Sequence, residues 1–142
     1  MRLGSNAKVD LLKQVPLFAG CSKKELEALA GIADEIDLQD GSVLTREGQP
    51  GREFFVLVEG TVDVTQGGEA IAKLDAGDWF GEIALLTKAT RTATVTAASP
   101  VRVLVVTDRA FRQVLETTPT IAVKMLERVG ERLGHDAELT SR

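Results

Sequence analysis

Residues 78–95 bring together the kinds of group that bind an anion: a glycine, a carboxylate and an arginine. Gly81 has no Cβ atom, so the backbone there can approach a ligand closely. A short helix beginning after Glu82 would direct its first free N–H groups, and the positive end of its dipole, at an anion. Arg91 can fold back over the same place and offer a planar pair of donors to a phosphate, while Glu82 can accept a hydrogen bond from a sugar hydroxyl. This arrangement predicts an anion-binding site.

A purely structural role is the alternative for the same residues. A carboxylate and an arginine such as Glu82 and Arg91 often form a partly buried ion pair at the end of a strand. Thr92 is typical of a strand for its β propensity alone. Trp79 and Phe80 precede the glycine, so we expect them to anchor the segment rather than to stack on a ligand. From the residues by themselves, both interpretations stay open.

Most familiar catalytic sites lack their residues in this chain. Cys21 is the single cysteine and His135 the single histidine among 142 residues, so neither a disulfide within the chain nor a recognised zinc spacing can form. The motifs GxxxxGK[ST], GxGxxG and HExxH do not occur in the sequence. We therefore expect no metal, no cofactor and no enzymatic activity.

The charge balance and the apolar runs argue against two classes of partner. Seventeen Lys and Arg stand against 21 Asp and Glu, a net charge of −4, and no stretch is basic, so nucleic acid is not an expected partner. Apolar runs such as residues 103–106 are far too short to span a membrane. Lys13 and Gln14 interrupt the one candidate signal region. The expected location is the cytoplasm.

The length and composition predict one compact domain over residues 1–142. A chain of this length can bury a core without disulfides or metals, and 44% hydrophobic with 27% charged residues is typical of a globular protein. Eight of the 13 glycines lie between residues 41 and 81, a spacing typical of short strands joined by turns. The expected strands are residues 42–47, 53–59, 61–66, 69–74, 92–98 and 101–106. This pattern indicates a barrel or a sandwich.

Helices are expected on both sides of these strands. Ser22 and Glu25 form a capping box that opens an N-terminal helix. After the last strand, Asp108 can cap a second helix, and Thr118 with Pro119 at the first helical position opens a third. Four apolar residues of this last helix form a stripe that would pack on the core or form a dimer seam: Ala122, Leu126, Val129 and Leu133. His135 is expected to be a solvated residue at the helix end.

Three segments share a pattern with one known family. Residues 80–95, FGEIALLTKATRTATV, resemble the phosphate-binding cassette of the cyclic-nucleotide-binding domain family, which catabolite-activator-type regulators, kinase regulatory subunits and cyclic-nucleotide-gated channels share. Residues 15–30 resemble its helical lead-in, and residues 46–64 its glycine-punctuated strand block. The resemblance covers residues 15–133 and favours a binding role for the cassette over a plain ion pair. Lys, Ala and Thr at residues 88–90 stand where many members have Gly and Pro, so we expect a looser turn.

The resemblance implies an α+β fold that is mainly β. Its centre would be an eight-stranded β-roll, also called a jelly roll or double-stranded β-helix, with N-terminal helices and two C-terminal helices. The parts would be a helical lead-in (1–33), the β-roll (34–107), hinge and lid helices (108–134) and a tail (135–142). No effector segment follows in the sequence, so the output would act through another chain.

The resemblance also implies how the cassette would bind a cyclic nucleotide. Arg91 would bind the exocyclic oxygens of the cyclic phosphate, and Glu82 would accept the ribose 2′-hydroxyl. The backbone amides of Ile83 and Ala84 would complete the phosphate cradle. Gly81 would admit the ribose.

The remaining candidates concern the base. Thr92 can reach the phosphate or the 2-amino group of a syn guanine, so it permits cGMP without excluding cAMP, and Ala93 would lie against the ligand. Phe80 opens the cassette and belongs to the same candidate site. One apolar residue of the last helix would pack on the purine. The sequence leaves three candidates for it: Leu126, Val129 and Leu133.

These implications predict a regulatory module that binds cAMP, or cGMP with slightly less preference, and moves its C-terminal helices in response. It would act on a separate, unidentified protein and exist as a monomer or a weak homodimer. The alternative is an interaction scaffold whose pocket is vestigial. The presence of Glu82, Arg91 and Thr92 together at working spacing argues against that alternative.

Overall fold

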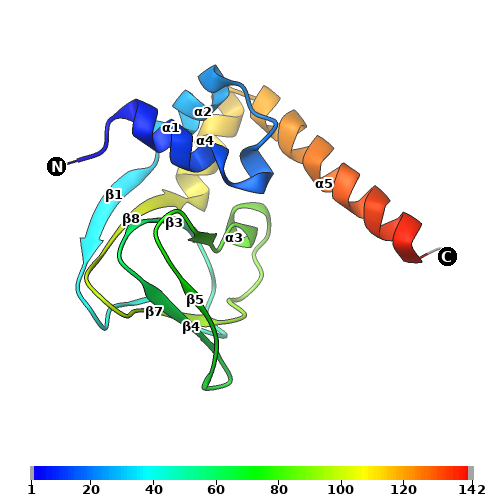
Figure 1. Cartoon of the computed structure of the whole chain (residues 1–142). Coiled ribbons are helices and arrows are strands. Elements are labelled where there is room, and N and C mark those ends of the chain that lie inside the picture. The colour runs from blue at the N-terminus through cyan, green and yellow to red at the C-terminus, as the bar shows by residue number, and fades with distance from the viewer. Residues whose placement is uncertain (1, 141–142) are drawn as a thin grey trace.

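The structure, a computed structural model, describes the backbone of residues 2–140 and the side chains of residues 2–131. The side chains of Leu133 and His135, on which two of the predictions fall, lie outside the described residues. The chain begins with three helical elements and ends with two long helices around eight strands (Figure 1). The N-terminal elements are α1 (Ser5–Lys13), the 3-10 helix η1 (Pro16–Phe18) and α2 (Lys23–Ala30).

The predicted capping box at the start of α2 is confirmed. The Ser22 hydroxyl accepts a hydrogen bond from the Glu25 amide at 3.2 Å, and the Glu25 carboxylate accepts one from the Ser22 amide at 2.7 Å. This reciprocal pair satisfies two N–H groups that the first turn of a helix would otherwise leave free. The helix can then bury Leu26 and Leu29 in the core.

Eight strands form two four-stranded antiparallel sheets, which confirms the predicted β-roll. The first sheet has the order β1-β8-β3-β6 and the second β2-β7-β4-β5, and neither closes into a barrel. The strands of the first sheet are β1 (Asp34–Leu38), β3 (Glu53–Glu59), β6 (Trp79–Phe80) and β8 (Val101–Thr107). Those of the second are β2 (Val43–Thr45), β4 (Val62–Gln66), β5 (Glu69–Leu74) and β7 (Thr94–Ala97). The six predicted strands did not include β1 or β6, because β1 carries three acids in five residues and β6 is two residues long.

The two sides of β3 show how the core is divided. Successive side chains of a strand point to opposite faces. Phe54 and Val56 join the cluster beneath the helices, where the Phe18 ring meets that of Phe54 edge-on with centroids 6.0 Å apart. Phe55 and Leu57 join the cluster between the two sheets. The first sheet is therefore covered on both faces, by helices and by the second sheet (Figure 1).

The last two helices are α4 (Asp108–Thr117) and α5 (Thr120–Thr140). The expected cap at Asp108 is wrong: Thr107 is the N-cap, and its hydroxyl accepts the Ala110 amide at 3.1 Å. Asp108 is instead the first residue of the helix, where a carboxylate also suits the dipole. Pro119 precedes α5, which begins at Thr120, one residue later than predicted.

The face by which α5 packs also differs from the prediction. Ile121 and Met125 are buried at 0% and 3% exposure, whereas Leu126 is 70% and Val129 37% exposed. Only the first turns of α5 cross the helical layer, and the rest of the helix extends away from the β-roll (Figure 1). The apolar stripe that includes Leu126 and Val129 is therefore not the face by which α5 packs on the core.

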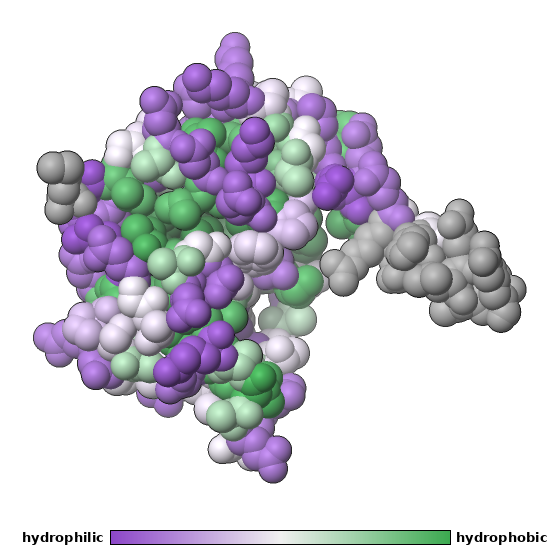
Figure 2. Space-filling view, viewed as in Figure 1, coloured by the Kyte–Doolittle hydropathy of each residue, from purple (hydrophilic) through white to green (hydrophobic). Residues whose placement is uncertain are grey.

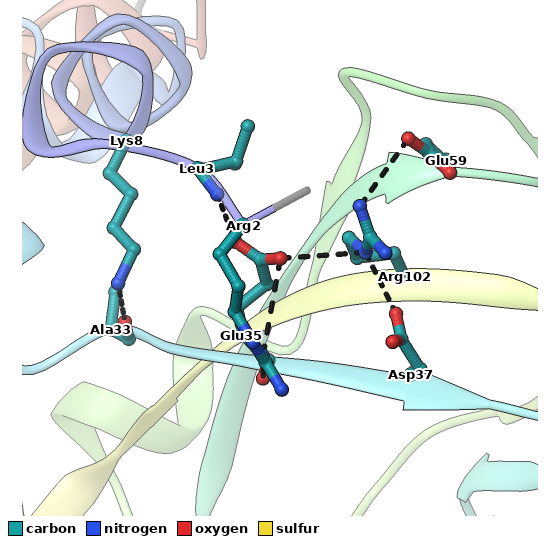
Figure 3. A network of polar contacts seen from close by, with 8 residues as sticks. All are labelled: Arg2, Leu3, Lys8, Ala33, Glu35, Asp37, Glu59 and Arg102. Atoms are coloured by element: carbon teal, nitrogen blue, oxygen red, sulfur yellow. Dashed lines mark hydrogen bonds and ion pairs between the residues drawn. The ribbon is translucent and has the colours of Figure 1, made fainter.

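The N-terminal arm is tied to the edge of the first sheet by a charged network (Figure 3). The buried Glu35 carboxylate on β1 accepts the Leu3 amide at 2.7 Å and lies 3.4 Å from Nε of Arg102 on β8. Lys8 of α1 donates to the Ala33 carbonyl at 2.7 Å. These contacts fasten the N-terminal arm and α1 to β1 and β8.

Candidate functional site

The eight predicted cassette residues all line one cavity of about 470 Å³. They come from β6, from the short helix α3 (Ile83–Leu86) and from the segment that leads into β7. The eight are Phe80, Gly81, Glu82, Ile83, Ala84, Arg91, Thr92 and Ala93. The fold therefore brings into one place residues that the sequence separates by up to 13 positions.

Arg91 supplies the positive charge of this cavity. Its side chain is 10% exposed, and its Nη2 donates a hydrogen bond to the Glu53 carbonyl oxygen at 2.8 Å. The Glu53 carboxylate lies farther away, 3.7 Å from the same nitrogen. Burial lowers the pKa of the Arg91 guanidinium, and the Glu53 charge partly opposes that shift. An arginine remains protonated at neutral pH despite such a shift, so the cavity keeps its cation.

Two glycines form the slot that holds this side chain. A Cβ atom on Gly51 would lie 2.7 Å from Nε of Arg91, and one on Gly81 would lie 2.7 Å from Nη1. Gly81 also has a φ of +83°, which side chains other than glycine rarely adopt. The space freed at Gly81, which was expected to admit a ribose, is occupied by the guanidinium in this structure.

The backbone of Arg91 is held as firmly as its side chain. Its N–H donates to the Gln49 carbonyl at 2.8 Å, and its own carbonyl accepts the Gly48 amide at 2.8 Å. The neighbouring Thr90 pairs with Pro50 as an isolated β-bridge. These bonds join the cassette to the loop between β2 and β3, so Arg91 enters the cavity from a fixed position.

The start of α3 is only partly available as an anion cradle. The Ala84 amide donates to the Gly81 carbonyl at 3.0 Å, and the Leu85 amide to the Glu82 carbonyl at 3.1 Å. Among the described residues no backbone acceptor is recorded for the Ile83 amide. The half-buried Glu82 carboxylate likewise has no recorded ion pair or hydrogen bond within the described part of the chain. Ile83 and Glu82 therefore retain groups for a ligand.

Sequence reasoning missed the apolar wall opposite the cassette. Val64, Ile71 and Leu74 line the cavity from β4 and β5, with Thr45 and Ala72. Ile71 is 54% exposed, a large apolar side chain that no helix or sheet covers. The alternating run of β5 was a signal for a strand, but nothing in it indicated that the strand faces the cassette.

A family model described as "Cyclic nucleotide-binding domain" matches residues 35–118. This range contains the cassette, the glycine slot and the apolar wall. The chain belongs to the cyclic nucleotide-binding domain family. It is a cyclic nucleotide-binding regulatory domain, and its eight-stranded β-roll with flanking helices is the fold of that family.

Three related proteins place this cyclic nucleotide-binding domain among regulatory proteins. A cAMP-dependent protein kinase regulatory subunit of Mycosarcoma maydis is 41% identical over 116 residues, which cover 73% of this chain and 22% of that protein. The structure of the N-terminal domain of a Streptomyces coelicolor transcriptional regulator has a TM-score of 0.84 and 28% identity, with coverage of 91% of this chain and 96% of that one. The structure titled "cAMP bound PfPKA-R" has a TM-score of 0.67 and 25% identity over 89% of this chain and 47% of that one. This domain thus spans about a fifth of the M. maydis kinase subunit.

Of the three candidate base-capping residues, neither Leu126 nor Val129 lines the 470 Å³ cavity of this cyclic nucleotide-binding domain. Val129 lines a second cavity of about 760 Å³, between η1, α3 and α5. Leu126 lines neither cavity, and the Leu133 side chain lies outside the described residues. Figure 2 shows hydrophobic side chains at the hollow between α5 and the body of the molecule. No helix of the described residues is long and apolar enough to cross a membrane.

Proposed function

We propose that the domain binds a 3′,5′-cyclic nucleotide in the 470 Å³ cavity, with Arg91 on the cyclic phosphate. The observation that carries this proposal is the environment of Arg91 in the lining of the cavity. Its side chain is only 10% exposed, and its guanidinium donates one hydrogen bond, to the Glu53 carbonyl at 2.8 Å. Within the described residues no hydrogen-bond partner is recorded for its Nε and Nη1. A buried cation with spare donors is suited to a bidentate anion such as a phosphate.

The other cassette residues take complementary roles in this proposal. Glu82 accepts the ribose 2′-hydroxyl, and the Ile83 amide donates to the phosphate, because both groups are free at the edge of the cavity. The apolar wall of Val64, Ile71 and Leu74 offers a surface for the flat base. Its large apolar side chains exclude water from one face of a purine and add little directional preference.

We favour cAMP over cGMP as the natural ligand. The named relatives include a cAMP-dependent kinase subunit and a cAMP-bound structure. Thr92 is exposed at the rim of the cavity, where its hydroxyl can also meet the 2-amino group of a guanine. Its presence therefore permits cGMP as the weaker ligand.

The response to the ligand is a movement of α5 toward the cassette. Ile83 and Leu86 of α3 are 55% and 45% exposed, and they line the same 760 Å³ cavity as Val129 of α5. Closure of this cavity would remove apolar surface of both helices from water, worth about 25 cal/mol per Å². A ligand drives the movement only if it binds the closed form better than the open one.

The domain acts as a sensor without catalysis, and its output passes to a separate protein. The described lining of the 470 Å³ cavity offers hydroxyls only from Thr45, Thr90 and Thr92, and it contains no His or Lys that could act as their general base. Residues 126–131 of α5 are exposed, and closure would change their surroundings. We therefore assign the partner's contact to this helix.

Titration of cAMP and of cGMP, followed by calorimetry, tests the binding proposal. Trp79 is the single tryptophan and lines both cavities, so its fluorescence provides a second signal. We expect a saturable isotherm for both nucleotides, with the lower Kd for cAMP. Absence of binding by either nucleotide would instead support a scaffold with a vestigial pocket.

Spin labels test the movement of α5. Glu127→Cys on α5 and Glu69→Cys on β5, in a Cys21→Ser background, give a pair whose distance reports closure. We expect the distance distribution to shorten when saturating cAMP is added. An unchanged distribution with bound cAMP would refute the switch while leaving the binding proposal intact.

A further inference from the structure

We propose that Glu53 makes this site selective for a singly charged cyclic phosphodiester over a doubly charged phosphate monoester. The inference rests on the proposed function and adds a residue that determines specificity. Glu53 lies at the start of β3, with its carboxylate 3.7 Å from Nη2 of Arg91. It is not among the described residues that line the cavity.

Two carboxylates oppose the single positive charge of the cavity before any ligand arrives. Arg91 is the sole cation among the described lining residues, and Glu82 is the sole carboxylate there. The Glu53 carboxylate brings a second negative charge to the Arg91 side of the site. One cation therefore faces two carboxylates, whose repulsion offsets part of the attraction of Arg91 and is larger for a ligand with two negative charges than for one with a single charge.

The Glu53 carboxylate is not needed to orient Arg91. The guanidinium donates to the Glu53 backbone carbonyl at 2.8 Å, and the slot between Gly51 and Gly81 fixes its plane. The carboxylate pairs with it at 3.7 Å, beyond hydrogen-bond distance, and its side chain is 43% exposed. A carboxylate at this distance acts on the ligand mainly through its charge.

The repulsion grows with the charge of the ligand. A cyclic phosphodiester carries one negative charge, whereas a phosphate monoester carries about 1.5 to 2 at pH 7 because its second pKa is about 6. Coulomb energy is proportional to that charge. Removal of the Glu53 charge should therefore tighten the cyclic nucleotide about threefold and the monoester about tenfold. The site would lose selectivity while it gains affinity.

Binding of cAMP and of its two ring-opened monoesters, 3′-AMP and 5′-AMP, to three proteins tests the inference. The proteins are the wild type, Glu53→Gln and Glu59→Gln. Glu59 is the matched control: it lies on the same strand and is 68% exposed, and its carboxylate is 3.6 Å from Arg102 rather than Arg91. Calorimetry gives the Kd of cAMP, and competition against cAMP gives those of the monoesters.

We expect Glu53→Gln to bind all three ligands more tightly and to lower the ratio of monoester Kd to cAMP Kd by about threefold. Glu59→Gln should leave that ratio at the wild-type value. An unchanged ratio in Glu53→Gln, or weaker binding of cAMP, would overturn the inference, and weaker binding would make Glu53 a positioning residue for Arg91. A wild type that does not bind cAMP would refute the proposed function and this inference with it.

A second measurement varies the pH instead of the ligand. Lowering the pH from about 7.5 to about 5 converts the monoesters to single anions and leaves the cyclic ester unchanged. The monoester Kd of the wild type should approach that of cAMP, and the change should be smaller in Glu53→Gln. A wild-type ratio that does not respond to pH would contradict selection by charge.

Discussion

Arg91 and Arg102 are two arginines of the same β-roll in opposite situations. Arg102 is surrounded by carboxylates: Nε lies 2.8 Å from Asp37, with Glu35 at 3.4 Å, and Nη1 lies 3.6 Å from Glu59 (Figure 3). Arg91 has one carboxylate, at 3.7 Å, and its closest hydrogen bond is to a backbone carbonyl. Arg102 therefore joins strands and the N-terminal arm, whereas Arg91 keeps donors for a ligand.

The pKa of the two guanidinium groups moves in opposite directions. The hydrogen bond with Asp37 raises the pKa of Arg102, and nearby carboxylates add to that shift. Burial lowers the pKa of Arg91, with only partial compensation by Glu53. A cation whose charge is costly to bury and poorly compensated gains most from an incoming anion. This contrast supports the proposal that Arg91 binds the ligand and that Arg102 is structural.

The largest expected effect is on ligand affinity. Arg91→Ala should weaken cAMP binding by about 2 to 5 kcal/mol, or tens to thousands of fold, because the phosphate loses its cation. Arg102→Ala should leave the Kd within about twofold, since its carboxylates lie on the far side of the sheet from the cassette. Calorimetry on both variants measures the difference. Equal losses would remove the distinction between the two residues.

The next effect comes from the slot around Arg91. Gly51→Ala places a Cβ within 2.9 Å of three Arg91 atoms, and Gly81→Ala adds the strain of a φ of +83°. Each variant should weaken cAMP binding about tenfold and lower the free energy of unfolding by at least about 1 kcal/mol. Binding isotherms and urea unfolding report the two quantities.

Gly130→Ala is the matched control for the slot variants. No atom lies within 4 Å of the added Cβ on α5. Because alanine is the better helix former, this variant should gain up to about 1 kcal/mol in the free energy of unfolding and keep its affinity. Wild-type affinity in Gly51→Ala and Gly81→Ala would show that the slot does not hold Arg91 in its binding position.

A smaller effect is expected on the thermal stability of the two arginine variants. Arg102→Ala leaves the Glu35 carboxylate, 3% exposed, without its cation from β8. It should lower the melting temperature more than Arg91→Ala does, because Glu53 is 43% exposed and can be solvated. Calorimetric melting of both variants at pH 7 checks this order. The reverse order would mean that Arg91 is the structural residue.

The last effect lies outside the cassette and concerns the Glu25 carboxylate, which caps α2 and lies 3.4 Å from Lys124 at the base of α5. The pKa of Glu25 is lowered to about 2, first by the Ser22 amide, with the Thr120 hydroxyl and Lys124 contributing. An unfolded glutamate titrates near about 4.3, so the stability that Glu25 contributes is complete above that pH and is lost as the pH falls toward 2. Urea unfolding between pH 6 and about 2.5 should show a smaller decline in Glu25→Gln than in the wild type. The exposed neighbour Glu27 provides the control, since Glu27→Gln should follow the wild type. If the free energy of unfolding of Glu25→Gln declined as steeply as that of the wild type, the loss of stability at low pH would come from other carboxylates.

Local features of the fold could be predicted from the sequence. The capping box of Ser22 and Glu25 and the positions of six of the eight strands depend on residues only a few positions apart. The cassette with Glu82 and Arg91 could also be predicted, because its groups follow one another within a single segment. The face on which α5 packs could not: an apolar stripe specifies a period, whereas Ile121 and Met125 are buried because of where the helix crosses the others.

The sequence by itself was enough to predict a β-roll with flanking helices, which the structure confirms, and to single out Arg91 as a candidate anion-binding residue. Only the tertiary structure decided what surrounds that arginine. Gly51 and Glu53 precede it by about 40 positions, and Ile71 lies on a strand of the other sheet. Composition and periodicity record preferences of neighbouring residues, while contacts between distant segments depend on how the sheets pair. The charge and shape of the site depend on those distant contacts.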